Sequence, residues 1–221
     1  AYLNTNKPKE AACTYINSSI IPNSSLIQRI SELNIAEALY KGNKLIAYSS
    51  EKSLSLNEIN NPDARISSQW SEGIISIERP WDIFSKNDLI LKSDFEQITN
   101  NRTSAPINSS NQIIGDQIFL EEGVEMEAAI INTKSGPVYL GKNSCVMEGS
   151  VIRGSMALCE SSTLKLSAKI YGPTTIGPHS KVGGELNNVV FQGYSNKAHD
   201  GFLGNSVIGA WCNIGADTNT S

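Results

Sequence analysis

From position 140 to position 182 an aliphatic residue returns at every sixth place. An amphipathic helix repeats near 3.6 residues and a half-buried strand near 2, so neither explains a step of six. A chain that winds through short, equal sides and buries one residue on each side does produce this step. The sequence therefore predicts a β-solenoid. The residues of the series are Leu140, Val146, Ile152, Leu158, Leu164, Ile170, Ile176 and Val182.

The series changes phase after Val182. The sequence slips by two positions at Gly183-Gly184, and a step of six then returns with a polar residue, Asn196, at a place where an aliphatic residue is expected. Most residues of the stretch 194–200 are polar, which predicts a segment that leaves the regular coil and forms a site. The residues expected to point inward in this phase are Val190, Asn196, Phe202, Ile208 and Ile214.

Glycine is distributed unevenly, which indicates two architectures. Of the 17 glycines only Gly42 and Gly73 precede position 113. Before that point, Pro80 suits the first turn of a helix whose apolar face ends near residue 98. We therefore expect part of an α/β domain at 1–98, a linker rich in Asn, Ser and Thr at 99–112, and the solenoid, truncated, at 113–221. The fold class is mainly β.

Charge and apolar patterning exclude several classes of function. The formal net charge is −4 and the 18 basic residues are scattered, which argues against binding to nucleic acid. No apolar run approaches the roughly 20 residues of a membrane span, and no signal peptide pattern is present, so we expect no membrane partner and a cytoplasmic protein. The four cysteines form no Cys-x-x-Cys pair, so neither a zinc site nor a disulfide framework is expected.

Both histidines lie in turns of the solenoid, in different surroundings. His179 follows Gly177-Pro178 at a corner between regular repeats, where a solvent-facing polar residue is the ordinary interpretation. His199 lies in the irregular stretch beside Asp200-Gly201. A polar loop histidine is common, but this position at a break in the repeat makes His199 the candidate for proton transfer.

Several motifs together resemble a known family over nearly the whole chain. They are Ile16-Asn17, Trp81-Asp82-Ile83-Phe84, Met147-Glu148-Gly149-Ser150, Lys181-Val182-Gly183-Gly184-Glu185, Tyr194-Ser195-Asn196-Lys197, His199-Asp200-Gly201-Phe202-Leu203-Gly204 and Asn213-Ile214-Gly215-Ala216. The chain is similar to sugar-1-phosphate nucleotidyltransferases of the bifunctional UDP-N-acetylglucosamine pyrophosphorylase / glucosamine-1-phosphate N-acetyltransferase family. The resemblance implies a left-handed parallel β-helix of triangular coils that assembles as a homotrimer, an exception to the right-handed crossover rule.

The resemblance also implies roles for individual residues. It makes His199 the base that takes a proton from a sugar amine while the amine attacks the thioester of acetyl-CoA, the co-substrate. It places Asn213, Lys197 and Phe202 against the acceptor sugar phosphate, and the backbone of Ala216 against the acyl donor. Each has a structural alternative, since asparagine at a corner can bond nearby backbone and alanine is a common packing residue.

Two features separate this chain from the acetyltransferases it resembles. Phe202 stands where they have a tyrosine, so the acceptor hydroxyl contact is missing. The further asparagine and lysine that complete the site in those enzymes would lie beyond Ser221. Because the first residue is Ala1 and the last repeat stops in mid-coil, we expect that residues are missing at both ends and that this fragment alone is inactive.

The part that resembles a nucleotidyltransferase contains no glycine-rich nucleotide loop. Its stretch Ile16-Asn17-Ser18-Ser19 resembles the family's sugar and metal region but contains no aspartate. We therefore assign no metal ligand, and expect Mg²⁺ and a nucleoside triphosphate only for the intact domain. The alternative interpretation of the solenoid is a non-catalytic trimerisation or regulatory scaffold.

Overall fold

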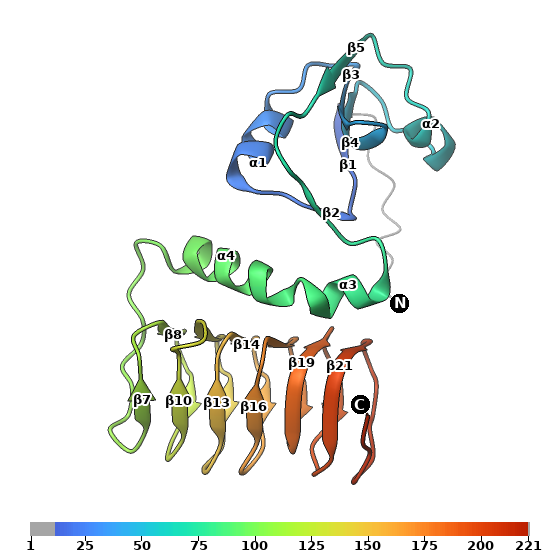
Figure 1. The fold of residues 1–221 in the computed structure, drawn as a ribbon. Coiled ribbons are helices and arrows are strands. Elements are labelled where there is room, and N and C mark those ends of the chain that lie inside the picture. The colour runs from blue at the N-terminus through green and yellow to red at the C-terminus, as the bar shows by residue number, and fades with distance from the viewer. Residues whose placement is uncertain (1–11, 221) are drawn as a thin grey trace. The chain divides into compact units, whose positions relative to one another are not determined.

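In the computed structural model the chain divides into two units, between Glu78 and Arg79 (Figure 1). The structure describes residues 12–220. The two ends at which we expect further residues, Ala1 and Ser221, lie outside the described residues. No helix of the described part is long and apolar enough to cross a membrane.

The first unit is an α/β arrangement around a four-stranded sheet with strand order β1-β4-β3-β5. Strands β1 and β3 run antiparallel to β4, and β5 runs parallel to β3. Its elements are β1 (Cys13–Ile16), β2 (Ile20–Ile21), α1 (Ser24–Ser31), β3 (Glu37–Lys41), β4 (Lys44–Ser50), α2 (Leu56–Asn60), β5 (Ile66–Gln69) and β6 (Ile75–Ser76). Leu26 and Ile30 of α1 pack with Leu39 and Ile46 of the sheet, which gives this unit its own core.

Two helices precede the solenoid and belong to the same unit as its coils. Helix α3 (Pro80–Ser85) packs on β19 (Glu185–Phe191) and β21 (Phe202–Ile208), and α4 (Asn87–Thr99) packs on β17 (Thr174–Ile176). At the start of α4, the Thr175 hydroxyl donates to Asn87 Oδ1 at 2.9 Å, and the Ser155 hydroxyl bonds the Asp88 carboxylate. The division therefore falls after Glu78 rather than after residue 98, because polar groups of α4 find partners on the solenoid.

The solenoid has three sides, each a parallel ladder of short strands from successive coils. Side 1 contains β7 (Gln112–Ile114), β10 (Ile130–Asn132), β13 (Val151–Arg153), β16 (Lys169–Tyr171) and the first halves of β19 (Glu185–Phe191) and β21 (Phe202–Ile208). Side 2 contains β8 (Ile118–Leu120), β11 (Val138–Leu140), β14 (Met156–Leu158), β17 (Thr174–Ile176) and the second halves of β19 and β21. Side 3 contains β9 (Glu125–Met126), β12 (Cys145–Val146), β15 (Thr163–Leu164), β18 (Lys181–Val182) and β20 (Asn196–Lys197).

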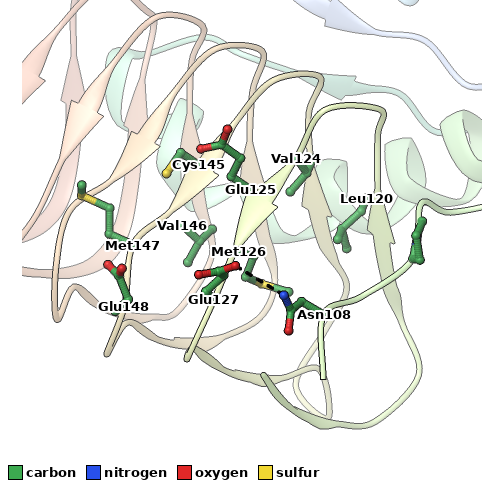
Figure 2. Close-up of a pocket in the computed structure, with 11 residues that line it drawn as sticks. Asn108, Leu120, Val124, Glu125, Met126, Glu127, Cys145, Val146, Met147 and Glu148 are labelled. Atoms are coloured by element: carbon green, nitrogen blue, oxygen red, sulfur yellow. Dashed lines mark hydrogen bonds between the residues drawn. The ribbon is translucent and has the colours of Figure 1, made fainter. Parts of the chain in front are cut away.

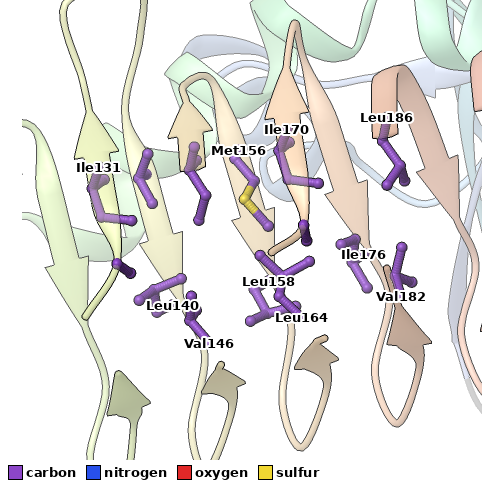
Figure 3. Packing of buried hydrophobic residues seen from close by; sticks show 14 of the residues in the cluster. Ile131, Leu140, Val146, Met156, Leu158, Leu164, Ile170, Ile176, Val182 and Leu186 are labelled. Atoms are coloured by element: carbon purple, nitrogen blue, oxygen red, sulfur yellow. The ribbon is translucent and has the colours of Figure 1, made fainter. Parts of the chain in front are cut away.

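The six-residue series forms the interior of this solenoid, as predicted. All eight residues from Leu140 to Val182 are at most 2% exposed. Figure 3 labels all of them except Ile152 and shows the labelled ones pointing into the space between the three sides. Strand pairing stacks each residue on its counterpart one coil away. The regular offset between coils is 18 residues, as between Ser162 and Ser180, which equals three sides of six. The predicted β-solenoid is therefore confirmed.

The coil after Val182 is shorter, and its inward residues differ from those expected. Ser180 and Ser195 are neighbours in adjacent coils at an offset of only 15. Strand pairing matches Ile176 with Phe191 and Val182 with Lys197, and Leu186 with Leu203. The expected inward residues Val190, Asn196 and Phe202 are therefore wrong by one position. The reason is that the step from Val182 to Leu186 is two residues short and the step from Leu186 to Phe191 is one residue short, which moves the inward phase until the expected positions return at Ile208.

One corner of the solenoid, between sides 2 and 3, keeps the same backbone conformation in successive coils. Asn143, Ser161, His179, Tyr194 and Trp211 occupy it with φ between 51° and 62°. In the last three coils its side chains are aromatic and stack, with ring centroids 4.9 Å apart for His179 and Tyr194 and 4.7 Å apart for Tyr194 and Trp211. His179 thus belongs to a structural ladder at the corner.

Candidate functional site

The last two described coils bring most of the predicted site residues together. The backbone of Asn196 pairs with Asn213, and Asp217 N donates to Asp200 O at 2.9 Å. Both pairs have an offset of 17, the offset that also relates the bonded side chains of Asn196 and Asn213. His199 lies in the loop that joins β20 to β21, and the same offset of 17 relates it to Ala216 in the next coil.

His199 is exposed, and its loop packs tightly on the preceding coil. A Cβ on Gly183 would lie 2.5 Å from Ala198 O, and one on Gly184 would lie 3.0 Å from His199 O. Side chains at these two places would push the loop away. Gly183-Gly184 therefore creates the surface on which the His199 loop rests, with the imidazole facing solvent rather than the core.

Lys197 lies inside the solenoid, away from the surface expected to meet substrate. Its side chain is completely buried. Its ammonium donates to His199 O at 3.0 Å and to Gly183 O at 3.3 Å. Desolvation lowers the pKa of Lys197, and the nearby Asp200 carboxylate opposes that shift. From this position the ammonium contacts the protein's own backbone, so the expected substrate contact is not made by this side chain.

The other two acceptor candidates are at the surface. Asn213 is exposed, and its Oδ1 accepts a hydrogen bond from Asn196 Nδ2 at 2.8 Å. Phe202 is half-buried at the start of β21, and a Cβ on Gly204 would lie 2.8 Å from two atoms of its ring. The phenyl ring therefore lies over Gly204, which keeps it close to the sheet and beside the His199 loop.

A separate pocket of about 530 Å³ lies on the outside of side 3, at β9 and β12 in the first coils. Figure 2 shows Glu125, Glu127 and Glu148 around it, with Asn108 donating to Glu127 at 3.4 Å. Three carboxylates repel a phosphate or a nucleotide. This pocket therefore does not suit a sugar phosphate, and it lies at the opposite end of the described coils from His199.

The described residues do not fit a magnesium site. Within 12–220 no group of three or more His, Cys, Asp or Glu side chains could hold a metal ion. The side chain of Asn17, in the stretch that resembles the family's sugar and metal region, is used internally. Its Nδ2 donates to Leu45 O at 2.8 Å and its Oδ1 accepts from Ser19 N at 3.0 Å. We derive no step through Mg²⁺ from these residues.

Comparison with known proteins addresses the first part of the chain. A family model described as sugar nucleotidyl transferase matches residues 1–103. This region of the chain is therefore similar to the sugar nucleotidyl transferases. The match extends past the structural division at Glu78, so this family region includes the two helices that pack on the solenoid.

A curated relative points to the same group of proteins. The chain is 34% identical over 85 residues to the bifunctional protein GlmU of Trichodesmium erythraeum (strain IMS101). The aligned part is 38% of this chain and 18% of that relative, so this chain matches about a fifth of the relative's length. Family and fold agree with the resemblance seen in the motifs, whereas the activity of the whole protein is a matter for proposal.

Sequence reasoning named His199 and Ala216 as site residues, and both lie in the last described coils. It missed that Lys197 points inward and that Gly183-Gly184 supports the loop. The spacing carried a signal for both: Val182 and Leu186 are four positions apart, although inward residues elsewhere are six apart. A corner shortened in this way brings the next loop close enough for glycine to be required.

Proposed function

We propose that the protein is a transferase of nucleotide-sugar synthesis whose solenoid moves an acetyl group from acetyl-CoA to the amine of an amino-sugar phosphate. The observation that carries the proposal is the exposure of His199 on a loop at the break in the repeat, where the neighbouring Asp200 is hydrogen-bonded to Asp217 of the next coil. A sugar nucleotidyl transferase region in the same chain supports a sugar phosphate as the substrate class.

The proposed step needs a base because a protonated amine has no lone pair. The amine nitrogen attacks the thioester carbonyl carbon, the new C–N bond forms, and the C–S bond breaks. His199 takes the proton that leaves the nitrogen and then gives it to the departing thiolate, which leaves as the free thiol of coenzyme A. Asn213 is the proposed contact to the sugar, and the backbone at Ala216 the proposed contact to the acyl donor. The intact nucleotidyltransferase domain would use a nucleoside triphosphate.

We propose a homotrimer with left-handed coils as the assembled form. Ile130, Val151 and Tyr171 are exposed apolar side chains on the outside of side 1, and they support an interface there. Cys145, Cys159 and Cys212 are free thiols, which supports a cytoplasmic location.

The test measures release of the coenzyme A thiol by the full-length protein with acetyl-CoA and a panel of amino-sugar phosphates. His199→Ala should lower the rate by about 10²-fold or more, as removal of a general base does. His179→Ala is the matched control, because His179 lies in the corner ladder, and it should retain the rate. Equal rates in the two variants would remove His199 from the mechanism.

A second function, a trimerising scaffold without chemistry, is favoured by one residue. Phe202 lacks the hydroxyl that the resembling acetyltransferases have at this place. A protein that sediments as a trimer but releases no thiol with any acceptor would establish the scaffold and refute acetyl transfer.

A further inference from the structure

Lys197 occupies a position that is apolar in every preceding coil of side 3. Strand pairing stacks Met126, Val146, Leu164, Val182 and then Lys197 in one inward column. The four earlier members are at most 5% exposed, and Lys197 is completely buried. An aliphatic residue fits this column, as Leu164 demonstrates, so packing alone does not account for a lysine.

A buried lysine is unusual because the ammonium loses its water. Lysine is almost never fully buried unless it is paired, and replacing a buried charge by an apolar residue is often neutral or stabilising. The ammonium of Lys197 is compensated by two backbone carbonyls, those of Gly183 and His199. These carbonyls belong to two successive coils, so a single ammonium ties together the supporting corner and the loop above it.

The shortened corner makes this contact geometrically available. Two residues are missing between the inward positions Val182 and Leu186, and the loop 198–201 descends onto Gly183-Gly184. The extended lysine side chain therefore reaches the loop's backbone from the inside, while the imidazole of His199 remains outside. The inside contact and the outside side chain belong to one peptide segment.

We infer that Lys197 is a positioning residue, which holds the backbone of His199 from inside the solenoid so that the imidazole is presented in one orientation. Its importance for catalysis rests on the proposed acetyl transfer, but the positioning itself does not. A donor in the core that satisfies a carbonyl of an exposed loop orders the loop without occupying the surface that a substrate needs.

The chain has two histidines, which makes a direct spectroscopic test feasible. Histidine labelled with ¹³C and ¹⁵N gives two imidazole signals, assigned with His179→Gln. In Lys197→Met, which keeps an unbranched stem but has no ammonium, the His199 signal should shift or broaden while the His179 signal stays in place. Amide exchange in 198–201 should accelerate about tenfold, the effect of losing a hydrogen bond of ordinary strength.

Leu164→Met is the matched control, because it places the same side chain in the same column two coils earlier. It should leave the His199 signal and the exchange of 198–201 unchanged. Lys197→Leu repeats the test with a residue that the column already accepts at Leu164, in case the methionine variant does not fold. A folded Lys197 variant with an unchanged His199 signal and unchanged exchange would overturn the inference.

Turnover separates this inference from the proposed function. If thiol release occurs, Lys197→Met should lower kcat by about tenfold or more with little change in KM, because orientation and not binding is lost. If no thiol release occurs but the His199 signal responds, the positioning stands and acetyl transfer fails. If turnover occurs and the spectra and kcat of Lys197→Met match the wild type, the positioning fails and the acetyl transfer stands.

Discussion

Gly184 carries the sharpest stability prediction, because two separate effects act on a substitution there. Its φ is +77°, and a Cβ would lie 2.8 Å from Gly201 O and 3.0 Å from His199 O. Both atoms are backbone, so the loop must move as a whole to make room. We therefore expect Gly184→Ala to strain the corner and to lift the His199 loop from its support.

The magnitude follows from these two terms. A left-handed conformation costs a residue with a Cβ roughly 1–2 kcal/mol, and the reduced freedom of the unfolded chain offsets about 0.4–1 kcal/mol of that. Forcing an extra carbon into a packed site costs roughly 1–3 kcal/mol more. The expected loss for Gly184→Ala is therefore roughly 1–5 kcal/mol in the free energy of unfolding, with a middle value of about 3 kcal/mol.

Gly149→Ala is the matched control at an earlier corner between the same two sides. Its φ is +75°, but its Cβ would meet a side-chain atom, Ser167 Oγ, at 3.1 Å, with the nearest backbone atoms at 3.8 Å. It should therefore show the strain term of about 1 kcal/mol and little else. The difference between the two variants isolates the contact with the His199 loop.

The measurement is urea unfolding followed by circular dichroism and by tryptophan fluorescence, at one protein concentration because assembly changes apparent stability. Trp211, in the coil next to the loop, reports on the solenoid. A difference between Gly184→Ala and Gly149→Ala below about 0.5 kcal/mol, the usual range of surface substitutions, would refute the tight contact.

Two further predictions concern other parts of the molecule. Buried Glu37 accepts hydrogen bonds from Ser68 and the Asn34 backbone and pairs with Arg29, and these contacts lower its pKa to about 2. The ionised carboxylate therefore stabilises the first unit above its ordinary pKa near 4.5, and this stabilisation is lost as the pH falls towards 2. Glu37→Gln should flatten the pH dependence of the free energy of unfolding between these two values, and an unchanged slope would contradict this. Phe202→Tyr restores the hydroxyl found in the resembling acetyltransferases. It should raise kcat/KM for amino-sugar phosphates by about tenfold, the value of one good hydrogen bond. An unchanged or lower kcat/KM would show that the ring over Gly204 cannot make this contact.

The fold was predictable where the pattern is local and repeated. A step of six between Leu140 and Val182 implies one inward residue on each short side, and every one of these residues is in the core. The domain boundary was less accessible, because α4 is held on the solenoid by Asn87 and Asp88, through contacts with residues far along the chain. The irregular segment that contains His199 was also predictable, because the regular series changes phase at Gly183-Gly184.

The phase after Gly183 shows where sequence reasoning ends. Residues 190, 191, 202 and 203 are all apolar, so either phase offers two apolar residues to the interior, and the two phases differ at 196 and 197. Burying a lysine is expected to cost more free energy than burying an asparagine. Sequence reasoning therefore favours the phase that places Asn196 inward, and that phase is wrong. The sequence pattern by itself predicts the solenoid, because a period of six residues places one inward residue on each side. The tertiary structure alone selects Lys197, because only the neighbouring coils supply the two carbonyls that make its burial tolerable.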